Sequence, residues 1–220
     1  MNDKISLKNE KSNNYRASSG LGKEIGTLLQ KNDYTIVNVS RKESAFEDIH
    51  ADLAQEDISE VITQIEQKHS DVNVLILNAG SMPLSLIGET NFDIDKLFRL
   101  NITSNIKLID GLYKTILKNK TDIVFIGSTA SKKGAPEHAI YCATKHAIDG
   151  YAKALRTEAG KKGIRVISFY PGGFNSNLRG GIQKEGYMNA ADLAKILMNT
   201  LELPRNAEVS EIIINRIKEK

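Results

Sequence analysis

This chain of 220 residues has no tryptophan and only one cysteine, Cys142. A single cysteine excludes an intrachain disulfide and a metal site made of several cysteine thiolates. Long apolar runs are also missing, since none reaches the roughly 18 residues of a membrane-spanning helix. The opening residues, MNDKISLKNEK, lack the apolar core of a signal peptide. These absences favour a cytoplasmic protein without membrane attachment.

An excess of charge of one sign is lacking too. The chain has 30 Lys and Arg residues against 27 Asp and Glu residues, and the formal net charge is only +3. The two signs are interleaved and form no basic block of the kind that binds nucleic acid. We therefore expect no nucleic-acid partner, and we predict no metal site.

What the chain does have is the composition of one folded domain, with 40% hydrophobic and 26% charged residues. Strand-like apolar runs alternate with segments of helical periodicity. The predicted strands are residues 34–39, 72–77, 122–126, 164–169 and 212–214. The predicted helices are residues 57–69, 92–118, 138–161 and 190–201.

This alternation predicts an α/β fold, a doubly wound parallel sheet with helices on both faces. Ligands bind such sheets at the carboxyl ends of the strands. Three segments leave those ends, residues 80–91, 128–137 and 172–188. The last is rich in glycine and is either a mobile lid over a substrate or a plain surface loop.

The strongest chemical signal is the pair Tyr141 and Lys145. On a helix, residues four apart share one face, so the lysine ammonium would lie near the phenol. Positive charge favours the phenolate and lowers the pKa of a tyrosine, which makes it a proton donor and acceptor near neutral pH. The alternative is an exposed Tyr-Lys pair on a helix surface. Ser128 and the turn Asn78-Ala79-Gly80 follow predicted strands and would meet this pair at the same sheet edge.

The motifs SSGLG, NAG, YCATK and PG, with Asn101 and Ser128 between them, occur in this order over residues 17–220. This combination resembles the short-chain dehydrogenase/reductase family, whose fold is Rossmann-like. By this resemblance Tyr141 is the general acid and base, and Lys145 lowers its pKa and binds the nicotinamide ribose. Ser128 would polarise the substrate carbonyl, and Asn101 would hold a water in the proton relay.

The resemblance also implies a set of cofactor-binding residues. The phosphate turn is expected at Ser18, Ser19, Gly20, Leu21 and Gly22, and the adenine contacts at Asp52 and Leu53. Asn78, Ala79 and Gly80 would lie beside the adenosine. Tyr141, Lys145, Pro171, Gly172, Phe174 and Ser176 would meet the nicotinamide half.

Charge at the end of the strand 34–39 predicts which cofactor is preferred. NAD-specific folds of this type place an acidic residue there, on the ribose 2′-hydroxyl. Here the residues are Ser40 and Arg41, with no acid. A guanidinium can bind a 2′-phosphate in bidentate fashion, so we predict NADP rather than NAD. The alternative is a solvated Arg41 that selects nothing.

The segment before this resemblance departs from the family. The family's first strand ends in Thr-Gly, and the matching residues here are Tyr15 and Arg16, after the polar stretch KNEKSNN. A codon string for residues 8–16, read one base out of register, translates as Lys-Met-Lys-Lys-Val-Ile-Ile-Thr-Gly. We hypothesise that residues 1–16 are an out-of-frame product and that residues 17–220 form the single domain.

The alternative is a genuine, divergent N-terminus. Ile5-Ser6-Leu7 would then be the only strand candidate, and the phosphate turn would be damaged. On either hypothesis the first strand is expected to be degenerate or missing.

Two functions therefore remain open. The first is an NADP-dependent oxidoreductase that transfers a hydride between the cofactor and a small carbonyl or alcohol substrate. The second is a catalytically impaired pseudoenzyme, a cofactor sensor or a scaffold. The resemblance also implies a homodimer or homotetramer formed through the helices at residues 92–118 and 138–161.

Overall fold

The computed structural model describes residues 11–15, 20–176 and 185–217. Its centre is a seven-stranded sheet with the order β3-β2-β1-β4-β5-β6-β7, in which every neighbouring pair is parallel. The strands are β1 (Lys11–Tyr15), β2 (Thr35–Ser40), β3 (Glu47–His50), β4 (Val72–Leu77), β5 (Asp122–Ile126), β6 (Val166–Pro171) and β7 (Glu211–Ile214). The predicted doubly wound α/β fold is confirmed.

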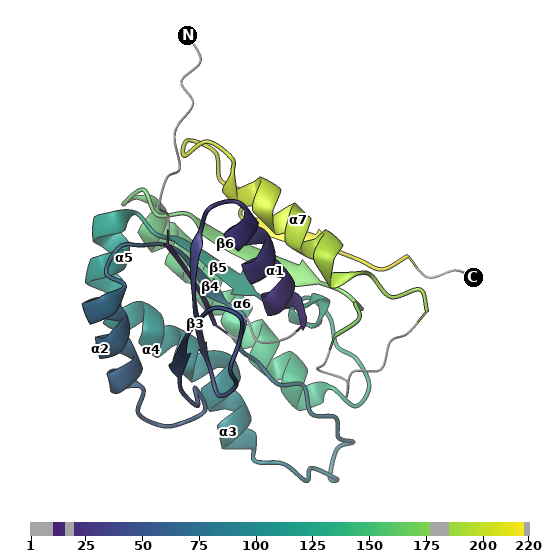
Figure 1. Ribbon diagram of the computed structural model, residues 1–220. Coiled ribbons are helices and arrows are strands. Elements are labelled where there is room, and N and C mark those ends of the chain that lie inside the picture. The colour runs from purple at the N-terminus through teal and green to yellow at the C-terminus, as the bar shows by residue number, and fades with distance from the viewer. Residues whose placement is uncertain (1–10, 16–19, 177–184, 218–220) are drawn as a thin grey trace.

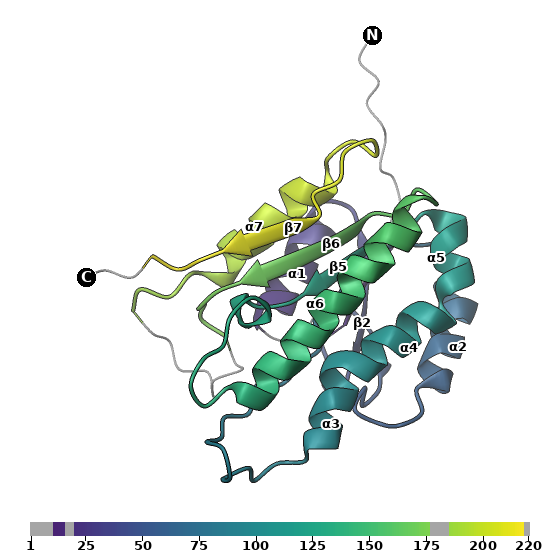
Figure 2. The same ribbon diagram turned by 180° about the vertical axis from the view of Figure 1, so that it is seen from behind.

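Helices cover both faces of this sheet. Figure 1 shows α1 (Gly20–Lys31) and α7 (Ala190–Leu201) on one face. Figure 2 shows the opposite face, which carries α4 (Ser104–Gly111), α5 (Tyr113–Asn119) and the long α6 (Ala139–Gly160). Helix α2 (Ser59–Lys68) packs on that second face as well, and α3 (Ile94–Phe98) leads into α4.

Each face of the sheet has its own apolar core. On one side, Ile25 and Leu29 of α1 and Leu197 of α7 pack against Ile76 and Phe169 of the sheet. On the other side, residues of α2, α4, α5 and α6 pack against the alternate residues of the same strands. Burial on both faces explains why β4 and β5 consist of apolar runs, and why the sequence predicts their bounds to the residue.

The first strand is present but has a polar sequence. Residues Lys11–Tyr15 lie between β2 and β4, with Asn13 in register with Val37 on one side and Leu75 on the other. A strand pairs through its backbone, so a polar segment can occupy this position. The expectation of a degenerate first strand is confirmed, whereas a missing strand is wrong. The alternative strand Ile5-Ser6-Leu7 lies outside the described residues.

Two further features differ from expectation. The edge strand β3 was not predicted, because Glu47–His50 is short and carries two acidic residues. The predicted helix at residues 92–118 is interrupted by the π-helix η1 (Arg99–Thr103) and again at Leu112. A π-helical turn inside an α-helix often marks a functional site.

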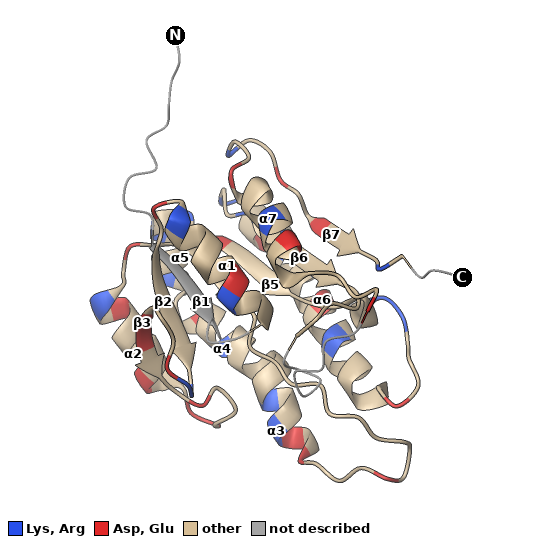
Figure 3. Cartoon of the chain, turned by 45° about the vertical axis from the view of Figure 1, so that its right-hand side comes forward, with Lys and Arg blue, Asp and Glu red and all other residues tan. Residues whose placement is uncertain are grey.

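Basic and acidic residues alternate along several elements of the fold. Figure 3 shows basic and acidic residues interspersed on α1, α2, α3 and α7. Among the residues that the structure describes, no helix is both long and apolar enough to span a bilayer.

Candidate active site

A cavity of about 210 Å³ lies at the carboxyl ends of β4, β5 and β6. In a doubly wound sheet this edge, near the point where the strand order reverses, is where ligands bind. The sheet reverses between β1 and β4. The cavity is lined by Asn78, Gly80, Ser81, Met82, Ile126, Gly127, Ser128, Thr129, Ala130, Lys133, Ala135, His138, Tyr141, Lys145, Pro171, Gly172, Gly173, Phe174 and Ser176.

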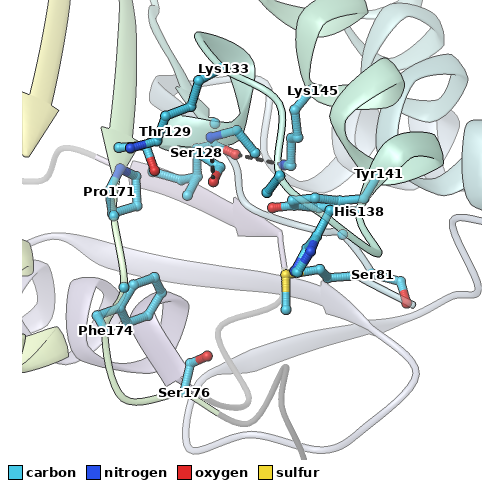
Figure 4. Close-up of a pocket in the computed structure, with 18 of the residues that line it drawn as sticks. Ser81, Ser128, Thr129, Lys133, His138, Tyr141, Lys145, Pro171, Phe174 and Ser176 are labelled. Atoms are coloured by element: carbon cyan, nitrogen blue, oxygen red, sulfur yellow. Dashed lines mark hydrogen bonds between the residues drawn. The ribbon is translucent and has the colours of Figure 1, made fainter. Parts of the chain in front are cut away.

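Tyr141 and Lys145 occupy the first turns of α6 and face this cavity (Figure 4). Both side chains are buried, with exposed fractions of 6% and 7%. The Lys145 ammonium lies 5.7 Å from the centre of the Tyr141 ring. The alternative of an exposed Tyr-Lys pair on a helix surface is therefore wrong for this helix.

Burial also changes the charge equilibrium of Lys145. Desolvation lowers the pKa of its ammonium from 10.5 to about 8. Its Nζ donates a hydrogen bond to the backbone oxygen of Ile126 at 3.2 Å. The lysine is thus fixed between the end of β5 and the first turns of α6, and it remains mostly protonated at neutral pH.

Ser128 enters the cavity from the end of β5. Its extended backbone directs the side chain to the start of the short 3₁₀ helix η2 (Thr129–Ser131). There the Ser128 Oγ accepts a hydrogen bond from the Ala130 backbone N at 3.1 Å. This bond fixes the hydroxyl rotamer and uses the oxygen only as an acceptor, so the hydroxyl proton can be donated to a ligand oxygen.

Asn101 does not line the cavity but clamps the elements that do. It lies in the π-helix and is 1% exposed. Its Oδ1 accepts from the Ser81 backbone N at 2.9 Å, while its Nδ2 donates to the Ser81 backbone O and to Thr144 Oγ1, each at 3.0 Å. Thr144 in turn donates to the Tyr141 backbone O at 2.8 Å. The side chain therefore joins the segment after β4 to the turn of α6 that carries Tyr141.

Of the residues expected beside the adenosine, Asn78 and Gly80 line this cavity, whereas Ser40, Arg41 and Asp52 lie outside it. Arg41 follows β2 and is 63% exposed, with its guanidinium 3.8 Å from the Asp52 carboxylate. Ser40 is buried, and its hydroxyl bonds within its own loop, donating to the Lys42 backbone O at 2.6 Å. Among Ser40, Arg41 and Asp52, only Arg41 therefore presents its polar atoms mainly to solvent.

The expected residues also include several whose side chains pack in the core. Leu53 and Ala79 are buried against the second face of the sheet, and Leu21 of α1 is buried in the core on the first face. These three residues therefore offer a ligand only their backbone atoms. Gly20 begins α1 with a positive φ of 58°, which favours glycine, and Gly22 is buried within the same helix. Ser18 and Ser19 lie outside the described residues.

Other residues of the cavity escaped the sequence analysis. Ser81 and Met82 directly follow Asn78-Ala79-Gly80, and His138 comes three residues before Tyr141. The ring centres of His138 and Tyr141 are 6.3 Å apart. Figure 4 shows Phe174 and Ser176 on another side of the cavity. Helical spacing could have identified His138, but the roles of Thr129 and Lys133 depend on how the loop after β5 folds.

Comparison with known proteins decides the family. The family model of the short chain dehydrogenases matches residues 16–186. The chain belongs to the short-chain dehydrogenase family. It is therefore a member of an oxidoreductase family.

Relatives of this short-chain dehydrogenase cover nearly its whole length. An uncharacterized short-chain type dehydrogenase/reductase of Sinorhizobium fredii is 30% identical, over 89% of this chain and 87% of its own. The farnesol dehydrogenase of Aedes aegypti is 27% identical, over 93% and 94%. An alcohol dehydrogenase of Thermococcus sibiricus, solved with 5-hydroxy-NADP, superimposes with a TM-score of 0.87 at 18% identity and covers 97% of this chain and 99% of its own. That likeness shows a shared fold.

Proposed function

We propose that this short-chain dehydrogenase is an NADP(H)-dependent enzyme that interconverts a small carbonyl compound and its alcohol. The observation that carries the proposal is the meeting of Tyr141, Lys145 and Ser128 in one cavity. A phenol, an ammonium and a hydroxyl are the groups needed to move a proton on and off a substrate oxygen.

Each of these side chains has a part in the reaction. The Ser128 hydroxyl donates a hydrogen bond to the carbonyl oxygen, on which negative charge develops during reduction. Tyr141 gives its phenolic proton to that oxygen, and in the reverse direction it accepts the proton from the alcohol. The Lys145 ammonium beside the ring favours the phenolate that proton donation leaves behind. When bound, the nicotinamide supplies or accepts the hydride.

Asn101 acts as a positioning residue in this proposal. Both N–H groups of its amide are donated to protein atoms, Ser81 O and Thr144 Oγ1. Its side chain therefore maintains the distance between the cavity wall and the catalytic turn of α6. If Asn101 also holds a relay water, the water must donate a hydrogen bond to an oxygen of Asn101, because both amide hydrogens are already used.

The chain offers residues that fit a phosphorylated dinucleotide. Gly20 has the left-handed backbone of a tight turn at the start of α1, where the amides of a helix N-terminus attract phosphate. Arg41 stands exposed directly after β2, at the position where NAD-specific folds of this type have an acidic residue, and its guanidinium lies 3.8 Å from the Asp52 carboxylate. Asn78 and Gly80 line the same cavity as Tyr141. These features support NADP over NAD.

One observation favours the second function, that of a catalytically impaired sensor or scaffold. Tyr15 ends the central strand β1 and Arg16 follows it, where the family pattern has Thr-Gly. A side chain in place of that glycine competes with the pyrophosphate for space. A protein that keeps the fold but binds cofactor weakly would be a sensor or scaffold.

The exchange Tyr141→Phe tests the proposed enzyme. We expect it to remove NADPH-dependent reduction of a panel of aldehydes and ketones while NADPH binding persists, because only the phenolic proton is lost. Tyr113→Phe, on α5 and outside the cavity, is the matched control and should keep its activity. Equal activity in Tyr141→Phe and the parent would refute the acid-base role.

We also propose self-association through α4, α5 and α6. On α6 the exposed residues Ala143, Ala147, Gly150 and Ala154 recur at helical spacing and form a stripe of small side chains. Such a stripe allows another helix to approach closely. Analytical ultracentrifugation should show a dimer or tetramer, and a monomer at micromolar concentration would contradict this.

A further inference from the structure

A second cavity adjoins the candidate active site. It measures about 170 Å³ and is lined by Thr129, Lys133, Gly172, Gly173, Tyr187, Asn215 and Arg216. Four of these residues, Thr129, Lys133, Gly172 and Gly173, also line the cavity that holds Tyr141. The two cavities are therefore neighbours across the loop that follows β5 and the end of β6.

The second cavity has a basic lining. Lys133 and Arg216 both contribute to it, and no aspartate or glutamate is among the described residues that line either cavity. The nearby Lys145 ammonium adds a third positive charge in the first cavity. An anion that enters here would meet cations without an opposing carboxylate.

The position of Arg216 is set by its neighbours. Its guanidinium lies 4.4 Å from the centre of the Tyr187 ring, a cation-π distance. The Tyr187 ring in turn lies against Gly173, where an added Cβ would be 3.0 Å from the ring. Gly173 thus allows the ring to approach the end of β6, and the ring supports Arg216 beside the cavity. A supported guanidinium loses less conformational freedom when it binds an anion.

We propose that the second cavity binds an anionic group of the substrate, a carboxylate or a phosphate, at the end remote from the reacting carbonyl. This inference rests on the proposed oxidoreductase function of the neighbouring cavity. Arg216 anchors the anion through charge-assisted hydrogen bonds, and Lys133 adds its charge at the junction of the two cavities. The anchored substrate then extends towards Ser128 and Tyr141 with its carbonyl.

Matched substrate pairs test this site. Levulinate is compared with its uncharged methyl ester, and dihydroxyacetone phosphate with dihydroxyacetone, in NADPH-dependent reduction. We expect kcat/KM to be at least about tenfold higher for the anionic member of one pair, which also identifies the anion as carboxylate or phosphate. The preference should decrease with added salt, because Lys133 is exposed.

Three variants connect the preference to the cavity. Arg216→Gln should reduce the preference about tenfold and leave the neutral member of each pair unchanged, and Lys133→Gln should have a smaller effect. Arg216→Lys keeps the charge and should retain part of the preference, which separates loss of charge from loss of folding. Lys118→Gln, on α5 and outside both cavities, is the control.

Binding separates failure of this site from failure of the enzyme. Levulinate and dihydroxyacetone phosphate are titrated by calorimetry in the presence of NADP⁺, which cannot reduce a ketone. If nothing turns over but one anion binds and Arg216→Gln abolishes that binding, the anion site stands and the proposed function fails. If the neutral and anionic members turn over equally, the anion site is wrong and the enzyme stands. If neither anion binds, the anion site is wrong.

Discussion

Lys145 shows how burial of one residue sets both chemistry and stability. Its ammonium is confined between Ile126 and the Tyr141 ring, and its pKa falls from 10.5 to about 8. At pH 7 the folded protein therefore keeps a charge that burial disfavours. The proposed reaction needs that charge beside the phenol, so function here opposes stability.

The pH dependence of unfolding tests this assignment. A pKa lowered to about 8 costs at most about 3 kcal/mol at pH 7. Between about pH 8 and pH 10.5 the unfolded state binds more protons than the folded state, so stability should rise with pH. Lys145→Met should lack this rise in urea unfolding at about pH 7 and about pH 10, whereas the surface variant Lys118→Met should keep it. An unchanged pH dependence in Lys145→Met would contradict the assignment.

Arg41 carries the cofactor prediction at the same scale. Arg41→Ala should weaken NADPH binding about tenfold, since a charge-assisted hydrogen bond to the 2′-phosphate is lost, and should leave NADH binding unchanged. Lys96→Ala is the matched control, because Lys96 also lies near Asp52, at 4.0 Å. Fluorescence titration with both cofactors measures the effect. An equal loss for NADPH and NADH would show that Arg41 selects nothing.

At the scale of elements, an ionic cluster joins the carboxyl side of the sheet to α6. Asp149 on α6 accepts hydrogen bonds from Lys132 Nζ at 3.0 Å, from Lys153 Nζ at 2.9 Å and from the Tyr170 hydroxyl. Lys132 also pairs with Glu211 of β7 at 2.9 Å. The cluster therefore connects α6 and β6 with Lys132, the residue that follows η2, four positions after Ser128.

Removing the charge of Asp149 should cost stability. Asp149→Asn leaves the cations around this buried position without their carboxylate, and we expect a loss of about 3 kcal/mol by urea unfolding at pH 7. Asp192→Asn breaks the pair with Lys195, also 2.9 Å long but 66% exposed on both sides, and should cost less than about 1 kcal/mol. Equal losses would refute the structural role of the cluster.

The same cluster predicts how the stability of the protein changes in acid. Burial raises the pKa of Asp149, but the hydrogen bonds from Tyr170, Lys153 and Lys132 outweigh it and hold the pKa below 3.8. The contribution of the carboxylate is therefore present above pH 3.8 and is lost as the pH falls through the lower folded value. The difference in the free energy of unfolding between Asp149→Asn and the parent should therefore become smaller below pH 3.8.

Individual elements differ in how well their sequence predicts them. β4, β5 and α7 were predicted to the residue, because apolar runs or a helical period end at polar residues, and Asn189 caps α7 through the Ala191 N. β3 could not be predicted, because its side chains lack a strand pattern and it is a strand only through its pairing with β2. The π-helix around Asn101 was also not predicted; there Asn101 bonds to Ser81 and Thr144, which are distant in the sequence.

At the scale of the whole molecule, the topology brings the site together. Asn78, Ser128 and Pro171 are far apart in the sequence but end adjacent strands, so their meeting was predictable once the strands were identified. The basic second cavity was not predictable, because it joins the loop after β5 to Arg216 beyond β7. That contact depends on how Tyr187 packs against Gly173.

The first strand has a polar sequence but a central position in the sheet. Lys11–Tyr15 lies at the centre of the sheet, beside Val37 and Leu75, which are fully buried. The out-of-frame hypothesis replaces this strand with Lys-Val-Ile-Ile-Thr, an apolar sequence typical of a strand buried on both faces, followed by glycine. We propose that residues 1–16 are such a product, which sequencing the encoding DNA would test.

A cofactor titration tests the central claim, that the domain from residue 17 onward is an NADP-binding dehydrogenase. The chain as written is compared with a restored chain that carries Asn9→Met, Glu10→Lys, Ser12→Val, Asn13→Ile, Asn14→Ile, Tyr15→Thr and Arg16→Gly. NADPH fluorescence is followed on mixing with each. We predict that the restored chain binds NADPH at least about tenfold more tightly than the unrestored chain does. The restored chain should also bind NADPH more tightly than it binds NADH. If the restored chain is folded and does not change NADPH fluorescence at high cofactor concentration, the claim is wrong.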